Sequence, residues 1–147
     1  MTAFVDSSAL VKLYVPERQH HEVRALSDPL VVASIARVEV CAAFWRKQRL
    51  GEIDAADAAV LSAGFEADLD DPEGPFAVVP VTDAVLASAA RCVTRHPLRA
   101  YDAVQLGTAL AAASVVPTLE TFVAFDASLR RAASAEGFVV LPTKLAR

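Results

Sequence analysis

Hydrophobic and polar residues along this chain form two patterns, short apolar runs and longer segments with an apolar residue every three or four positions. The short runs predict buried strands at 2–5, 30–33, 76–79, 121–125 and 138–141. The longer segments predict helices at 7–15, 18–26, 35–50, 55–69, 83–96, 100–113 and 128–136. Strands that alternate with helices in this way favour an α/β fold with a parallel sheet covered by helices on both faces.

Polar residues and glycines predict where several helices begin and end. Ser34, Asp54 and Thr82 each stand just before a helical segment and are expected to be N-caps. Gly51 and Gly137 each follow a helical segment and are expected to end it. The segments 27–29 and 70–75 have the composition of a turn and a loop, respectively.

The chain has 147 residues, enough for one domain with a proper core, and we find no linker, internal repeat or low-complexity segment in it. We therefore expect a single domain spanning residues 1–147. No apolar run approaches the roughly 20 residues of a membrane-spanning helix, and the N-terminus enters a strand without a signal-peptide pattern. These features predict a cytoplasmic protein with no membrane partner.

Charge is distributed unevenly along the chain, although the net charge is only −4. The segment from Glu52 to Glu73 holds eight acidic residues and neither lysine nor arginine. The rest of the chain has 14 basic and 10 acidic residues, a net charge of +4. The negative total therefore does not exclude a phosphate-bearing substrate. For the acidic segment itself, the sequence indicates only a solvated helix face and loop.

Four acidic residues stand at positions that solvation alone does not explain. Asp6 and Asp126 each follow an apolar strand, and the carboxyl ends of parallel strands lie along one edge of a sheet. Glu39 lies about one turn into a helix that follows a strand, so it belongs near the same edge. Asp102 lies in the first turn of the most apolar helix, whose start the sequence does not place.

Each of these acids also has an ordinary structural interpretation. Asp6 and Asp126 could be N-caps, and Asp102 could favour the helix dipole. Glu39 could form an ion pair with Arg37 or with another basic residue. If the four acids instead gather at one site, they repel one another and raise one another's pKa. A divalent cation removes that penalty, and ligands that offer only oxygen suit Mg²⁺ or Mn²⁺ rather than zinc.

The four acids also stand within four motifs that follow one another along the chain. The motifs resemble those of PIN-domain ribonucleases, and most closely the VapC-type toxins of bacterial type II toxin–antitoxin pairs: Asp6-Ser7-Ser8-Ala9-Leu10, Ala36-Arg37-Val38-Glu39-Val40, Leu98-Arg99-Ala100-Tyr101-Asp102-Ala103-Val104-Gln105-Leu106 and Phe125-Asp126-Ala127-Ser128-Leu129. The resemblance runs nearly end to end in motif order and length. One departure is Ala124, where many members carry threonine or serine two residues before the last acid.

The resemblance implies a PIN-like three-layer sandwich with a central parallel sheet of four or five strands. It also implies a metal-dependent endoribonuclease that hydrolyses RNA phosphodiesters with Mg²⁺ or Mn²⁺ as cofactor. In such an enzyme the metal lowers the pKa of a bound water and neutralises charge on the phosphate. The implied catalytic residues and metal ligands are Asp6, Glu39, Asp102 and Asp126, with Ser7 and Ser8 orienting a carboxylate or a metal-bound water.

An RNA substrate requires positive charge around an acidic pocket. Arg37 and Arg99 are nearest to the acidic motifs in sequence and are the candidates for binding RNA, with pairing to the carboxylates as their alternative role. The basic residues in 46–49 fit a solvated helix end, and the pattern around Tyr101 is typical of a core aromatic. The resemblance further implies a homodimer that is neutralised by a cognate antitoxin.

Other functions are compatible with parts of this sequence. A PIN domain could act in RNA processing or RNA binding without being a toxin. A receiver-like signalling domain requires an Asp at the end of the third strand and a Lys at the end of the last. Here the third strand leads into Val79-Pro80-Val81, and the only late lysine is Lys144. A phosphatase of the DxD type is excluded because Ser8 occupies the position of the second acid.

Overall fold

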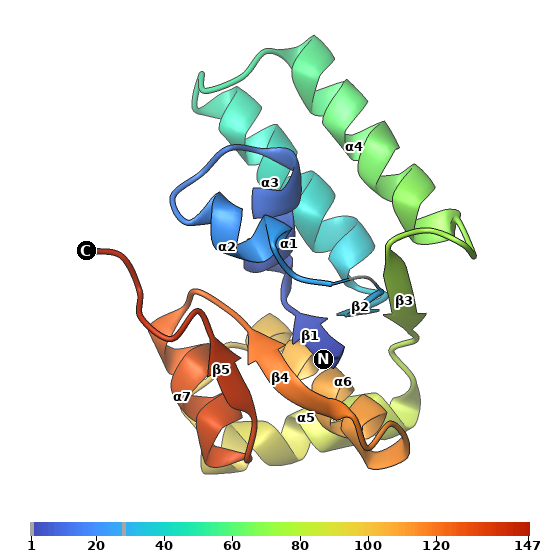
Figure 1. Cartoon of the computed structure of the whole chain (residues 1–147), viewed down its shortest axis with the longest axis vertical. Coiled ribbons are helices and arrows are strands. Elements are labelled where there is room, and N and C mark those ends of the chain that lie inside the picture. The colour runs from blue at the N-terminus through green and yellow to red at the C-terminus, as the bar shows by residue number, and fades with distance from the viewer. Residues whose placement is uncertain (1, 28) are drawn as a thin grey trace.

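The computed structural model describes residues 2–27 and 29–147, and its strands form one parallel sheet between two layers of helices (Figure 1). The strands are β1 (Thr2–Val5), β2 (Leu30–Ala33), β3 (Phe76–Val79), β4 (Leu119–Val123) and β5 (Val139–Leu141). Their order across the sheet is β3-β2-β1-β4-β5, and every neighbouring pair is parallel. The predicted α/β sandwich with a parallel sheet is confirmed, and β1 is its central strand.

Helices cover both faces of this sheet (Figure 1). One layer contains α1 (Ser7–Tyr14), α2 (His20–Arg24), α3 (Ala36–Arg49) and α4 (Ala55–Asp70). The other contains α5 (Asp83–Arg95), α6 (Ala100–Val115) and α7 (Ala127–Ala135). Because side chains alternate along a strand, Phe4 of β1 enters the core under α5–α7, whereas Ala3 and Val5 enter the core under α1–α4.

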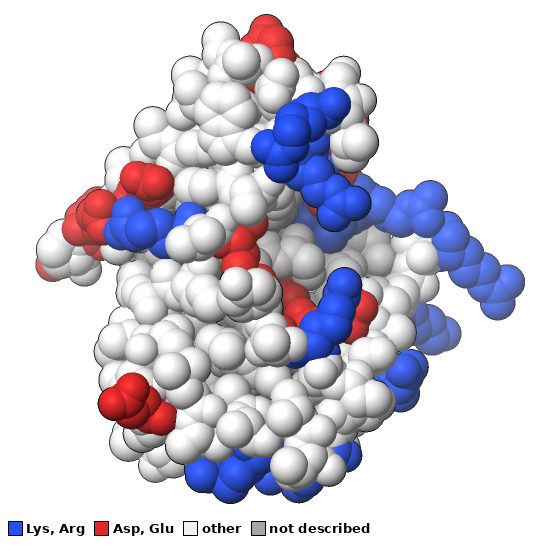
Figure 2. All heavy atoms as spheres, turned by 180° about the vertical axis from the view of Figure 1, so that it is seen from behind, with Lys and Arg blue, Asp and Glu red and all other residues white. Residues whose placement is uncertain are grey.

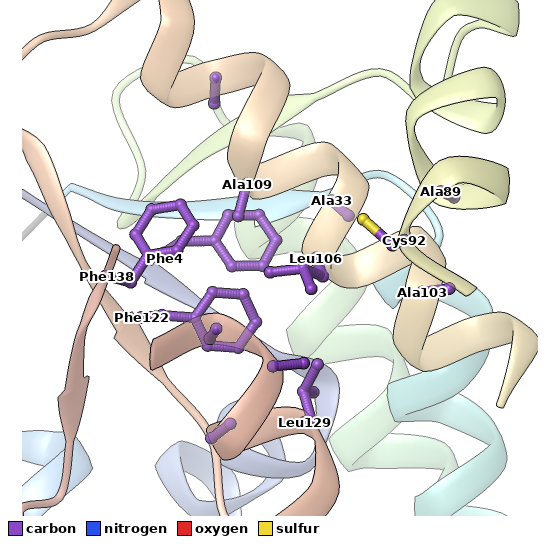
Figure 3. Close-up of a cluster of buried hydrophobic side chains, with 14 of the residues drawn as sticks. Phe4, Ala33, Ala89, Cys92, Ala103, Leu106, Ala109, Phe122, Leu129 and Phe138 are labelled. Atoms are coloured by element: carbon purple, nitrogen blue, oxygen red, sulfur yellow. The ribbon is translucent and has the colours of Figure 1, made fainter. Parts of the chain in front are cut away.

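The core beneath α5–α7 holds α6 close to the sheet (Figure 3). The rings of Phe4 and Phe122 stack with centroids 5.2 Å apart, and Leu106 of α6 is fully buried beside them. Helices α5 and α6 approach closely at Gly107, where an added Cβ would lie 2.8 Å from the backbone nitrogen of Ala89. A side chain at that position would push α6 away from α5, so this glycine helps to fix α6 and the residues of its first turn.

Most predicted helix caps are confirmed. The side chain of Asp54 accepts the N–H of Asp57 at 2.7 Å, and Thr82 accepts that of Val85 at 3.2 Å. Gly51 and Gly137 adopt left-handed φ values of 76° and 101°, respectively, at the ends of α3 and α7.

The cap predicted at Ser34 is wrong. The hydroxyl of Ser34 accepts the backbone N–H of Val81 at 3.0 Å, and α3 begins after Ile35 without a side-chain cap. The Ser34 side chain therefore bonds to a loop that is distant in sequence, whereas the local pattern predicted that it would cap the helix.

Other boundaries differ from the prediction by a few residues. Helix α2 covers only His20–Arg24, because Gln19 before it has a left-handed φ of 63°. Strand β4 ends at Val123, earlier than predicted, so Asp126 follows a short loop instead of ending the strand. The turn predicted at 27–29 includes Asp28, which lies outside the described residues. None of the described helices is both long and apolar enough to cross a membrane.

Candidate active site

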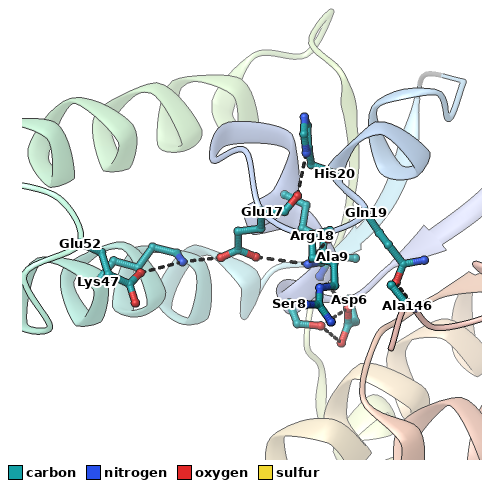
Figure 4. A network of polar contacts seen from close by, with 11 residues as sticks. Asp6, Ser8, Ala9, Glu17, Arg18, Gln19, His20, Lys47, Glu52 and Ala146 are labelled. Carbon is teal, nitrogen blue, oxygen red and sulfur yellow. Dashed lines mark hydrogen bonds and ion pairs between the residues drawn. The ribbon is translucent and has the colours of Figure 1, made fainter.

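Asp6 follows the last residue of β1 and is nearly fully buried, with 4% of its surface exposed. Its carboxylate accepts the backbone N–H of Ala9 at 3.0 Å and the hydroxyl of Ser8 at 2.9 and 3.1 Å, so it caps α1 (Figure 4). Burial raises the pKa of Asp6 to about 7; these hydrogen bonds oppose the rise, and the charges of Asp102 and Glu39 add to it. The capping role is therefore present, and carboxylate oxygens can accept further contacts.

Glu39, in the first turn of α3, is held by side chains from two other helices. The hydroxyl of Ser7 donates to Glu39 Oε1 at 3.0 Å, and Gln105 Nε2 donates to the same oxygen at 2.7 Å. Gln105 Nε2 also lies 2.9 Å from Ser7 Oγ. Burial raises the pKa of Glu39, the two hydrogen bonds oppose this, and the charge of Asp102 adds to the rise. The starts of α1 and α3 are thus tied to α6 through one carboxylate.

Gln105 is the residue of this group that sequence reasoning missed. It is only 1% exposed, and its Oε1 atom is buried with no hydrogen-bond partner among the described residues. Gln105 lies three residues after Asp102, so the two side chains share one face of α6. An amide on the buried face of an apolar helix was the available signal, because such a group requires a polar partner.

Asp102 and Asp126 complete the acidic group. Burial raises the pKa of Asp102, and the charge of Asp126 raises it further, while Arg99 lowers it. Arg99 Nε lies 3.7 Å from Asp102 Oδ2, on a side chain that is 85% exposed. Asp126 accepts the N–H of Leu129 at 2.9 Å and caps α7, as one of the sequence alternatives predicted.

Electrostatic interactions connect all four acids. The charges of Glu39 and Asp102 act on Asp6, and the charge of Asp126 acts on Asp102. In residues 2–27 and 29–147, no three His, Cys, Asp or Glu side chains converge closely enough to ligate one ion as they stand. The donors are nevertheless all carboxylate oxygens, which Mg²⁺ and Mn²⁺ prefer. No Lys or Arg of the described chain lies within the 4.0 Å of an ion pair from Asp6 or Glu39, so the donor set fits a divalent cation.

Arg37 points away from Glu39. Its guanidinium pairs with Glu66 at 3.6 Å and with Asp70, both on α4. The ion pair with Glu39 that the sequence left open is therefore absent, and α3 is tied to α4 instead. The hydroxyl of Tyr14 also donates to Asp68 of α4. These contacts give the acidic segment a structural role beyond the solvated face that the sequence indicated.

Ion pairs also connect the end of α1 with α3, beside Ser8 (Figure 4). Glu17 accepts Lys12 Nζ at 3.3 Å and Lys47 Nζ at 2.5 Å, and Lys47 reaches Glu52 at 3.3 Å. The Lys12 side chain is only 11% exposed, so this part of the network is shielded from water. These contacts hold α1, which is capped by Asp6, against α3, which carries Glu39.

A groove of about 650 Å³ opens next to Glu39. It is lined by residues of α3, the residue before α3 and the start of α6: Ile35, Val38, Glu39, Ala42, Ala43, Arg46, Arg49 and Tyr101. Tyr101 is 63% exposed, so the prediction that it belongs to the core is wrong. On the face seen in Figure 2, acidic side chains lie in a hollow near the middle of the molecule, with basic side chains around it.

Comparison with known families gives a direct match for most of this chain. Residues 3–135 match the PIN domain family. The chain belongs to this family. Membership of the PIN domain family confirms the resemblance found in the sequence and sets aside the receiver-like alternative. Among curated proteins, no sequence matches this PIN domain.

Solved structures with the same fold include proteins of toxin–antitoxin systems. VapC20 of Mycobacterium tuberculosis, described as a sarcin–ricin loop cleaving toxin, is 20% identical and has a TM-score of 0.63, covering 94% of this chain and 97% of its own. FitAcB from Neisseria gonorrhoeae is 16% identical with a TM-score of 0.63, covering 95% and 96%. A toxin–antitoxin complex from Klebsiella pneumoniae is 15% identical with a TM-score of 0.57, covering 85% and 87%. Likeness at these identities establishes the fold.

Proposed function

We propose that this PIN domain is a metal-dependent endoribonuclease that hydrolyses RNA phosphodiesters, and that it is the toxin of a toxin–antitoxin pair. The observation that carries the proposal is the group of four electrostatically connected acids, Asp6, Glu39, Asp102 and Asp126, of which Asp6 is buried without a basic partner among the described residues. Buried carboxylates of this kind destabilise a fold unless a cation offsets their charge. Selection for a metal site explains their presence.

The four acids would hold Mg²⁺ or Mn²⁺. A divalent ion bound there supplies positive charge for the phosphate and lowers the pKa of a water molecule. The surrounding residues hold the carboxylates in place, Ser8 at Asp6 and both Ser7 and Gln105 at Glu39. Because these donors point at carboxylate oxygens, they favour the ionised form that binds a cation.

Arg99 is the basic residue best situated to contact RNA near the acids, because it is exposed and lies beside Asp102. Arg37 could contact RNA only by exchanging its ion pairs with Glu66 and Asp70. The relatives with this fold support a cognate antitoxin as partner, since one of them is a toxin–antitoxin complex. We further propose a homodimer that acts on RNA in the cytoplasm.

The nuclease is tested by incubating purified protein with RNA in Mg²⁺ or Mn²⁺, and again with chelator. Wild-type protein should cleave internal phosphodiesters only when metal is present, and Asp6→Asn should be inactive in both conditions. The Glu136→Gln variant, changed at a carboxylate remote from the acidic group, is a matched control and should cleave normally. Cleavage that survives both the chelator and Asp6→Asn would exclude this mechanism.

The toxin role is tested in a bacterial host. Expression of the wild-type protein should arrest growth, whereas expression of Asp6→Asn should not. Co-expression of a small protein encoded immediately upstream of the gene should restore growth. Normal growth together with metal-dependent cleavage in vitro would favour a PIN domain of RNA processing over a toxin.

A further inference from the structure

We propose that the groove along α3 is a nucleotide subsite, in which an unpaired RNA base stacks on Tyr101 while Arg46 and Arg49 bind the phosphates that follow. The inference rests on the proposed function, because it describes how a single-stranded substrate extends away from the acidic group. It specifies that the substrate is unpaired where it enters the site.

The groove is continuous with the acidic group. Glu39 forms part of its lining, and Tyr101 immediately precedes Asp102 at the start of α6. An RNA strand whose scissile phosphate lies at the acids therefore has the groove as its neighbouring space. The volume of about 650 Å³ is ample for one nucleotide and part of the next, within the usual range of ligand pockets.

One face of α3 carries the residues that the strand would contact. Glu39, Ala42, Arg46 and Arg49 recur every three or four positions, so their side chains lie on the same side of the helix. With a rise of about 1.5 Å per residue, Arg46 and Arg49 lie about 10 and 15 Å along the axis from Glu39. The small side chain of Ala42 between them leaves the floor of the groove open.

The two arginines are free to bind an anion. Both are exposed, and no acidic side chain in the described part of the chain lies within the 4.0 Å of an ion pair from either guanidinium. By contrast, Arg37 and Lys47 of the same helix are each paired with two acids. Planar guanidinium groups bind phosphate oxygens in a two-pronged arrangement, so their charge favours a polyanionic strand over an apolar peptide.

The aromatic part of the groove fits a base. Tyr101 is 63% exposed at the start of α6, and the apolar side chains of Ile35 and Val38 line the same groove. An exposed ring beside apolar side chains and unpaired arginines is the combination with which proteins bind single-stranded nucleic acid. Only an unpaired base can reach the ring, because bases in a duplex are already stacked on their neighbours.

The test measures binding of a short fluorescein-labelled RNA of randomised sequence by fluorescence anisotropy, in chelator so that no cleavage occurs. Tyr101→Ala should weaken binding of the single strand by roughly 5- to 150-fold, whereas Tyr101→Phe should bind like the wild type. Binding of a duplex with matched composition should not change. Because Tyr101 is exposed, thermal melting should show that both variants remain folded.

The arginines are tested through the salt dependence of binding. The double variant Arg46→Gln/Arg49→Gln should reduce the slope of log affinity against log salt by about 1.4, since each phosphate contact on a single strand contributes about 0.7. Arg91→Gln, at an exposed arginine outside the groove, is the control and should leave the slope unchanged.

Two failures are distinguishable. If wild-type protein cleaves RNA with metal but Tyr101→Ala and the double arginine variant bind the single strand normally, the subsite is refuted and the groove has another occupant, such as a segment of a protein partner. If wild-type protein neither binds RNA nor cleaves it with any divalent metal, the proposed function fails, and the subsite fails with it.

Discussion

Two carboxylates of this PIN domain lie in opposite surroundings. Glu136, at the end of α7, lies 2.9 Å from His96 Nε2 and 2.6 Å from Arg95 Nη2, and these groups lower its pKa. Asp6, at the end of β1, has neutral hydrogen-bond donors and acidic neighbours, and its pKa rises to about 7. The protein supplies the Arg95 guanidinium for Glu136, whereas no Lys or Arg in the described part of the chain pairs with Asp6, and this supports the proposal that the acids around Asp6 bind a cation from solution.

The difference has an energetic consequence. A pKa that rises from 3.8 to about 7 makes ionisation of Asp6 about 4 kcal/mol more costly in the folded chain than in the unfolded chain. Glu136 has the opposite effect, because its ionised form is favoured by folding. A residue retained at such a cost is expected to serve function, whereas Glu136 is expected to serve stability.

The largest expected effect comes from Asp6→Asn. RNA cleavage should fall by about 10²- to 10³-fold or more, as expected for loss of a charged group that acts on the transition state. Stability without metal at neutral pH should rise by up to about 4 kcal/mol, because asparagine can still cap α1 and carries no buried charge. Cleavage assays and urea unfolding in chelator measure the two effects. A variant that is both inactive and less stable would show that Asp6 is needed mainly for the fold.

The pH dependence of stability should also separate the two carboxylates. The folded state holds a proton on Asp6 up to pH of about 7, whereas the unfolded state releases it near 3.8. Stability without metal should therefore increase as pH falls, by about 2–3 kcal/mol between pH 8 and pH 5. Glu136 acts in the opposite direction, but only near and below its ordinary pKa of 4.5. Urea unfolding of wild type and Asp6→Asn in chelator tests this, since the variant should lack the increase.

Local sequence pattern was sufficient to predict the sheet and the position of Asp6 at its edge. Buried parallel strands are continuous apolar runs, and the acid that follows β1 lies at the edge where such strands end. The helix caps at Asp54 and Thr82 could also be predicted from local sequence, because each side chain accepts a backbone N–H only three residues further along the chain.

Features that depend on contacts between distant segments could not be predicted in the same way. Ser34 bonds to Val81 instead of capping α3, and Arg37 reaches α4 instead of Glu39. Tyr101 looked like a core residue because it begins an apolar helix, but its position at the first turn leaves it exposed. Gln105 acquires its role only when α6 packs beside the starts of α1 and α3.

A smaller effect is expected from Gln105→Leu, which removes the amide that holds Glu39 and Ser7. Affinity for Mn²⁺ should fall by about tenfold, as is typical for groups that orient a metal ligand, and activity should recover at high Mn²⁺. Isothermal titration of Mn²⁺ and cleavage across a range of Mn²⁺ concentrations measure these effects.

Thr108→Val is the matched control on the same helix. Thr108 is fully buried one turn beyond Gln105, and its hydroxyl donates to the Val104 carbonyl at 2.7 Å and not to any of the four acids. Its replacement should change stability without changing Mn²⁺ affinity. Equal loss of Mn²⁺ affinity in both variants would mean that Gln105 acts only through the packing of α6.

The smallest effect is expected at Glu136, the carboxylate that has basic partners. Glu136→Gln removes a charge that folding favours, so stability at neutral pH should fall by about 1 kcal/mol, which for a domain of this size lowers Tm by about 3 °C. RNA cleavage and Mn²⁺ affinity should stay at wild-type values, because Glu136 and its partners are separate from the acidic group. Thermal melting beside the two functional assays tests this. A change in Mn²⁺ affinity would show that the two regions are coupled, and the acids around Asp6 could then no longer be treated as an independent site.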